Sequence, residues 1–95
     1  MNHLDANCKI IKTAERESDG AIYRYELSQR HISGFQDPLF SITVEMLRAN
    51  DKTTRAKTED AFSDSEKAIS LFEKLVKSLA TPIDLAYVLE DELIN

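Results

Sequence analysis

The stretch that decides the fold runs over residues 62–95 and reads FSDSEKAISLFEKLVKSLATPIDLAYVLEDELIN. Upstream of it, apolar and polar residues alternate with the period of two that is typical of β-strands, whereas within it apolar residues recur at helical spacing. A sheet built from the first sixty residues would have one apolar face, and the helices that follow could cover it. The sequence therefore predicts an α+β fold, an antiparallel sheet of three to four strands covered on one face by two C-terminal helices.

The two helices are predicted over about residues 64–80 and 82–93. Ser63 is the expected N-cap of the first helix, because Glu66 three residues later completes a capping-box pattern, and Asp64 is a competing cap. Thr81 is the expected N-cap of the second helix, and Pro82 suits its first turn while ending the helix before it. The apolar positions of the two segments are Ala68, Ile69, Phe72, Leu75, Val76, Leu79, Leu85, Ala86, Val88, Leu89 and Leu93.

Strands are predicted over residues 9–17, 21–28, 39–47 and 53–60. The pair Asp19-Gly20 supplies the positive φ angles of a tight hairpin turn between the first two. The strand 39–47 alternates most strongly and is rich in β-branched residues, so we expect it at the centre of the sheet. The polar strand 53–60 suits an edge, where charge discourages pairing with other chains.

The first two strands differ in how clearly they alternate. In the first, Ile10, Lys12 and Ala14 would share one face, which gives a mixed pattern. In the second, Tyr23 and Tyr25 share a face with other apolar residues. Aromatic side chains on a sheet can stack nucleic-acid bases, but this pattern favours their burial beneath the helices.

Length and composition bound the class of protein. A chain of 95 residues with 42% apolar and 31% charged residues is typical of one globular domain, here residues 1–95. Cys8 is the single cysteine and cannot form an internal disulfide, so we expect a cytoplasmic protein. The N-terminus does not resemble a signal peptide, and no apolar stretch approaches the roughly 20 residues of a membrane span.

Charge is distributed unevenly along the chain. Residues 1–57 hold nine Lys or Arg against eight Asp or Glu, whereas residues 58–95 hold three against nine. Acidic helices would repel a phosphate backbone, so general nucleic-acid binding is not expected. A local basic cluster surrounds a predicted turn at residues 50–51, and a solvated hairpin tip explains it simply. Its members are Arg48, Lys52, Arg55 and Lys57.

The sequence contains no recognisable catalytic, cofactor-binding or metal-binding residues. His3 and His31 are the only ready general bases at neutral pH, and neither has a sequence partner that marks a triad. Together with Cys8 they lack the spacing of a metal site. Gly20 and Gly34 are isolated, so no phosphate-binding loop is present. We therefore predict that the protein is not an enzyme and needs no cofactor.

The C-terminal pattern carries a family resemblance. A Ser/Thr-Pro-x-x-Leu entry that leads into an acidic, apolar final helix resembles a family of small uncharacterised bacterial proteins, chiefly from anaerobic Gram-positive bacteria. The resemblance covers the chain from the third strand onward, and it implies a shared fold with no assigned activity. The matching positions are Asp60, Ser63, Pro82, Leu85, Val88, Glu90, Asp91 and Leu93.

Two hypotheses of function follow. The leading one is a small cytoplasmic protein-interaction or regulatory module, whose partner is a protein and which could form a homodimer; its acidic helical surface is the first place to look for that partner. The alternative is a small-ligand or nucleic-acid binder that uses the connection at residues 29–38 and the basic turn at residues 48–57.

Overall fold

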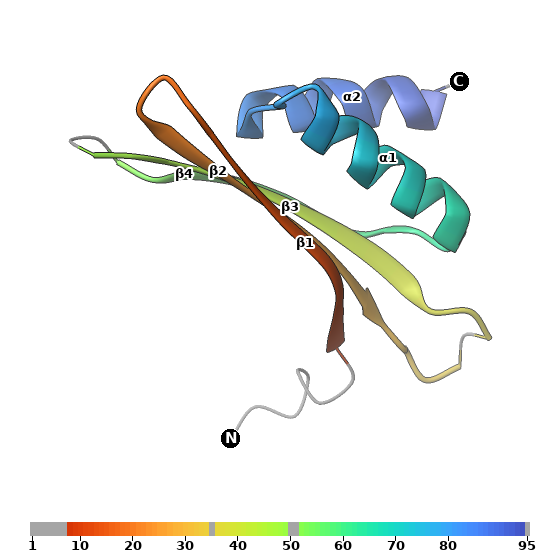
Figure 1. Cartoon of the computed structure of the whole chain (residues 1–95). Helices are drawn as coiled ribbons and strands as arrows, with labels where there is room; N and C mark the ends of the chain where they lie inside the picture. The colour runs from red at the N-terminus through yellow and green to blue at the C-terminus, as the bar shows by residue number, and fades with distance from the viewer. Residues whose placement is uncertain (1–7, 35, 50–51, 95) are drawn as a thin grey trace.

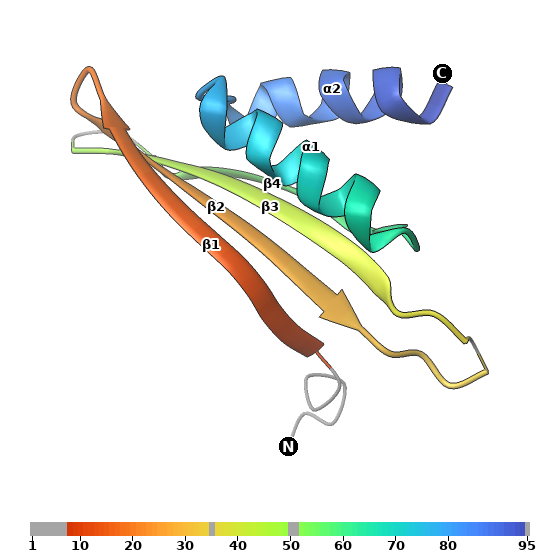
Figure 2. The same ribbon diagram turned by 45° about the vertical axis from the view of Figure 1, so that its right-hand side comes forward.

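The strands form one antiparallel sheet with both helices on the same face. The computed structural model describes residues 8–34, 36–49 and 52–94, with side chains up to residue 88. Its elements are β1 (Cys8–Ser18), β2 (Ala21–Arg30), β3 (Leu39–Arg48), β4 (Thr54–Phe62), α1 (Ser65–Lys77) and α2 (Pro82–Ile94). The sheet order is β1-β2-β3-β4, and the two helices lie on one side of it (Figure 1, Figure 2). The predicted α+β architecture is confirmed, as are the central β3 and the edge strand β4.

The turn between β1 and β2 has the predicted form. Asp19 and Gly20 have φ angles of 52° and 77°, as a two-residue type I′ hairpin requires. Ser18 therefore pairs with Ala21, and the pairing continues residue by residue back along β1. This turn sets which β1 side chain lies beside which β2 side chain.

A bulge in β1 explains the mixed pattern of that strand. Ile10 pairs with Ser28 but Lys12 pairs with Leu27, so the register shifts by one residue around Ile11. The prediction that Ile10, Lys12 and Ala14 share a face is wrong, because a one-residue bulge moves every later side chain to the other side. Lys12 and Ala14 lie on the face of the helices, whereas Ile10 lies on the opposite face.

The core lies between the sheet and the helices. α1 covers the centre of the sheet, and α2 lies over β3 and β4. Tyr23 and Tyr25 are buried there, as predicted. The Tyr25 hydroxyl donates a 2.8 Å hydrogen bond to the carbonyl of Ala80 in the connection between the helices. The largest fully buried side chains are Tyr25, Leu27, Ile42, Val44, Leu75 and Leu85.

Asp64, and not Ser63, caps the start of α1. One Asp64 carboxylate oxygen accepts from the backbone N–H groups of Glu66 at 3.0 Å and Lys67 at 3.3 Å. A carboxylate carries a full negative charge toward the positive end of the helix dipole, which a Ser hydroxyl cannot supply. The predicted Ser63 cap is therefore wrong, and the competing cap is correct.

The connection between the helices ends α1 earlier than predicted, at Lys77. Leu79 has a φ of 56°, and the N–H groups of Leu79 and Ala80 donate to the carbonyls of Val76 and Leu75. This pair of bonds is the Schellman motif, in which a left-handed residue closes the last turn. A helix cannot continue through that conformation, so the prediction of helix to residue 80 is corrected.

The start of α2 follows the prediction. The Thr81 hydroxyl accepts from the Asp84 N–H at 3.2 Å, and the Asp84 carboxylate accepts from the Thr81 N–H at 3.0 Å. This reciprocal arrangement satisfies two backbone donors at once. The predictions for Leu89 and for the side chains of residues 90–93 lie outside the described side chains.

Hydrogen bonds and an ion pair connect β1 to α1. Lys12 Nζ lies 2.8 Å from Glu73 Oε2. The Arg16 guanidinium donates to the carbonyls of Val76 at 2.9 Å and Lys77 at 3.1 Å. A cation at the C-terminus of a helix interacts favourably with its dipole. In the described part of the chain, both helices therefore lie on one face of the sheet.

Candidate functional site

The sheet face opposite the helices is the candidate site, and we call it the open face. Alternation places every second side chain of each strand on it, and no helix of the described part of the chain lies against it (Figure 1, Figure 2). Most of its side chains are polar or charged. Its central members are Thr13, Glu15, Ile22, Arg24, Glu26, Ser28, Ser41, Thr43, Glu45, Leu47, Arg55 and Lys57.

Four alternating charges cross the whole width of the open face, and we call them the charge row. Glu15 on β1 is directly opposite Arg24 on β2, which is opposite Glu45 on β3, which is opposite Arg55 on β4. Neighbouring strands lie about 4.8 Å apart, so each charge has an opposite charge beside it. The row begins with an acid at one edge of the sheet and ends with a base at the other.

Arg24 makes the ion pairs within the charge row. Its Nε lies 2.9 Å from Glu15 Oε2, and its Nη1 lies 3.9 Å from Glu45 Oε1. The side chains of Arg24 and Glu15 are 53% and 59% exposed, and that of Glu45 is 28% exposed. Solvated pairs of this kind contribute little to stability. Because the side chains of Arg24 and Glu15 are exposed, their charges remain accessible to a partner.

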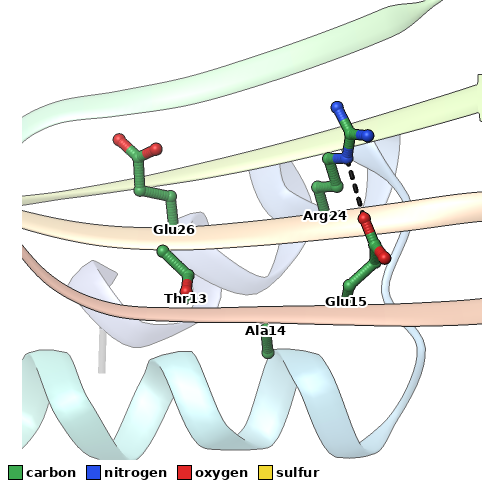
Figure 3. A pocket seen from close by; sticks show the side chains of 5 residues that line it. All are labelled: Thr13, Ala14, Glu15, Arg24 and Glu26. Atoms are coloured by element: carbon green, nitrogen blue, oxygen red, sulfur yellow. Dashed lines mark hydrogen bonds and ion pairs between the residues drawn. The ribbon is translucent and has the colours of Figure 1, made fainter.

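A second row beside the first alternates short and long side chains. Thr13, Glu26, Thr43 and Lys57 are opposite one another across the four strands. The short threonines leave two hollows of about 410 and 290 Å³, and Arg24 and Glu26 line both. Figure 3 shows the first hollow, with Arg24 bonded to Glu15 while Ala14 points toward α1.

An ion pair between β2 and β4 lies beyond the second row. Arg30 of β2 donates to Asp60 of β4, and this hydrogen bond, reinforced by the charge of Asp60, raises the pKa of Arg30. Asp60 has a φ of 51°, and its N–H donates to Ser41 Oγ at 2.8 Å. Asp tolerates this left-handed conformation better than most residues. The sequence singled out Asp60 only as a family position, so its role was missed.

The distortion at Asp60 also changes the pairing of β4. Phe40 pairs with Phe62 while Ile42 pairs with Thr58, so β4 holds two more residues than β3 over this interval. Asp60 Oδ1 is buried and accepts no hydrogen bond from the described residues. The irregularity ends the regular face at this end of β4 and leaves the charge row in the regular part of the sheet.

The predicted basic cluster is divided between the two faces. Arg55 and Lys57 lie on the open face, opposite Glu45 and Thr43. Arg48 pairs with the core residue Ala21 and so lies on the side of the helices. The predicted turn at residues 50–51 lies outside the described residues.

The other residues considered from the sequence do not join the open-face site. His31 is exposed in the connection between β2 and β3, which spans residues 31–38 and not 29–38, because β2 continues to Arg30. His3 lies outside the described residues. Within residues 8–34, 36–49 and 52–94, no group of three or more His, Cys, Asp or Glu residues could hold a metal ion.

Comparison with known proteins identifies a family. The family model described as a family of unknown function (DUF6514) matches residues 6–95. No curated protein and no solved structure matches the chain. In the part of the chain that the structure describes, no helix is long and apolar enough to cross a membrane. Because the match spans nearly the whole sequence and all of the open face, this chain belongs to that family of unknown function.

Proposed function

We propose that this chain is a small protein-interaction module that docks a partner protein on its open face. The charge row is the single observation that carries the proposal. A solvent-exposed sheet face needs only scattered charged side chains to stay hydrated, whereas here acidic and basic residues alternate in register across all four strands. A partner surface with the reversed alternation would place an opposite charge against each of them.

The chemistry of the open face favours a protein over a polyanion. A nucleic acid would bring its phosphates against Glu15, Glu26 and Glu45, which are interspersed with the bases. A protein can instead present both signs at the spacing of a strand pair. The half-buried Ile22 and Leu47 lie opposite each other at one end of the face and would add apolar contact.

Arg24 makes the proposal testable, because it is the centre of the charge row. In a capture experiment with the chain tagged at its N-terminus, Arg24→Glu should abolish capture of a partner protein from a lysate of the source cells. The captured protein is identified by mass spectrometry. Lys67→Glu on α1 makes the same change of net charge on the other side of the molecule and should leave capture intact. Equal capture by both variants would contradict docking on the open face.

The proposed role is non-catalytic and cytoplasmic. Docking requires only the charges and the shape of the open face, and it consumes no cofactor. The absence of a second cysteine suits a reducing compartment. A fluorescent fusion that localises to the cytoplasm would support this placement, and one that localises to the cell envelope would contradict it.

A further inference from the structure

We infer that the partner docked on the open face is a second copy of this chain; this inference rests on the proposed function and names the occupant of the same site. The charge row reads acid, base, acid, base from β1 to β4. Read in reverse, it is base, acid, base, acid. The row is therefore complementary to its own reversal.

One symmetry operation produces that reversal. A twofold axis that runs parallel to the strands, midway between β2 and β3 in the plane of contact, places β1 of one copy over β4 of the other. Glu15 then faces Arg55 of the second copy, and Arg24 faces Glu45 of the second copy. Because a twofold interface is isologous, each of these contacts occurs twice, giving four pairs of opposite charge.

The neighbouring rows fit the same axis. In the second row, Glu26 faces Thr43 of the second copy, and Lys57 faces Thr13 of the second copy. No like charges meet, and a long side chain can enter a hollow above a short one.

At the end of the face nearest the β1–β2 hairpin, the two central strands are apolar and also fit, with Glu17 of β1 beside them at the edge. Ile22 and Leu47 are cross-strand neighbours on the two central strands. The twofold axis brings Ile22 over Leu47 of the second copy and Leu47 over Ile22 of the second copy. Full burial of these half-buried side chains favours association without depending on charge.

The alternative axis is disfavoured by charge. A twofold axis perpendicular to the strands and along the charge row would place each charge against its own copy. Glu15 would face Glu15 and Arg24 would face Arg24, which is repulsive at every position. Both axes keep the strands of the two sheets nearly aligned, as face-to-face sheets commonly are, so charge distinguishes them.

The size of the open face predicts a weak dimer. Four strands about 4.8 Å apart and about ten residues long, rising about 3.3 Å per residue, cover roughly 600 Å². Two such faces bury about 1,200 Å², at the lower end of specific interfaces. We expect a dissociation constant on the order of 10 μM. Raising the salt from about 0.05 M to about 0.5 M should weaken it by about tenfold.

A charge exchange between two variants tests the inference. Arg24→Glu and Glu45→Arg should each weaken self-association at least about tenfold, because the twofold axis then brings two like-charge pairs together. An equimolar mixture of the two variants should dimerise again, since each introduced carboxylate faces an introduced guanidinium. Sedimentation velocity over a concentration series measures the wild type, each variant and the mixture. Lys67→Glu and Glu66→Arg, both exposed on α1, are matched controls that should dimerise like the wild type.

Each outcome decides the inference. Restored dimerisation in the mixture supports it, and a wild type that stays monomeric at about 1 mM overturns it, as does a mixture that stays monomeric. If either charge reversal unfolds, as circular dichroism would show, Arg24→Gln and Glu45→Gln replace them, and dimerisation as strong as that of the wild type overturns the inference. A monomeric wild type that still captures another protein through Arg24 overturns the self-docking alone and leaves the proposed function standing. A wild type that neither self-associates nor captures another protein overturns both the self-docking and the proposed function.

Discussion

The two faces of the sheet are built from the same four strands and differ in burial and polarity. On the covered face, Tyr25, Leu27, Ile42 and Val44 are almost completely buried under the helices. On the open face, side chains one position along the same strands form solvated ion pairs. Burial of apolar area stabilises a fold strongly, whereas exposed ion pairs contribute little to it. The covered face therefore supplies stability, and recognition is the role that we propose for the open face.

The sharpest contrast is expected between two leucines. Leu75 of α1 is 1% exposed in the core between the helices and the sheet, so Leu75→Ala should lower the free energy of unfolding by about 3 kcal/mol through lost burial and a cavity. Leu47→Ala on the open face is the matched control and should cost less than about 1.5 kcal/mol, because Leu47 is only half-buried. Urea unfolding measures both. Equal losses of unfolding free energy in the two variants would contradict the distinction between the faces.

The Tyr25 hydroxyl should make the stability of the covered face depend on alkaline pH. Burial raises its pKa to about 12 from 10.0, so the folded state holds this proton more tightly than the unfolded state. The resulting stability is complete below pH 10 and is lost as the pH rises to about 12. The free-energy advantage of the wild type over Tyr25→Phe should shrink by up to about 2 kcal/mol over that window.

Chemical denaturation at a series of pH values measures this difference. The matched control is Tyr87→Phe, which removes a hydroxyl from an exposed tyrosine on α2 and should follow the wild type. A constant difference between the wild type and Tyr25→Phe from pH 9 to 12 would contradict the assignment of the effect to Tyr25.

The cap of α1 should have an intermediate effect. Asp64→Ala should cost about 1 kcal/mol, because two backbone N–H groups lose their acceptor. Ser63→Ala should change stability by less than about 0.3 kcal/mol, since Asp64 fills the cap position. Thermal unfolding of the two variants distinguishes them. A larger loss of stability for Ser63→Ala than for Asp64→Ala would support the Ser63 cap that the sequence predicted.

The smallest effect on stability is expected within the charge row. In a double-mutant cycle of Glu15→Gln and Arg24→Gln, the coupling energy should be below about 0.5 kcal/mol in dilute solution, because both side chains are more than half exposed. The same substitutions should nevertheless weaken self-association. A large coupling in the monomer would mean that the row serves stability and not recognition.

The sequence predicted the covered face far better than the open face. Alternation in β2 and β3 and helical spacing in α1 locate the core, because burial leaves a direct periodic signal. The pairing of Glu15 with Arg24 could have been found, because the two-residue turn at Asp19-Gly20 sets that register.

The remainder of the open face depends on registers that no short turn sets. The pairing of Arg24 with Glu45 crosses the connection at residues 31–38, and that of Glu45 with Arg55 crosses the connection at residues 49–53. Bulges at Ile11 and near Asp60 shift pairing without a clear sequence signal. The charge row is therefore a tertiary feature, visible only once all four strands are in place.

A dilution series followed by ¹⁵N NMR spectra tests the central claim most directly. Between about 1 mM and 20 μM, we predict concentration-dependent shifts in the amide signals of β2 and β3 and in the Arg24 Nε–H signal, as the open faces separate. The amide signals of α1 should stay constant. Shifts that map to α1, or spectra that do not change with concentration, would contradict self-docking through the open face.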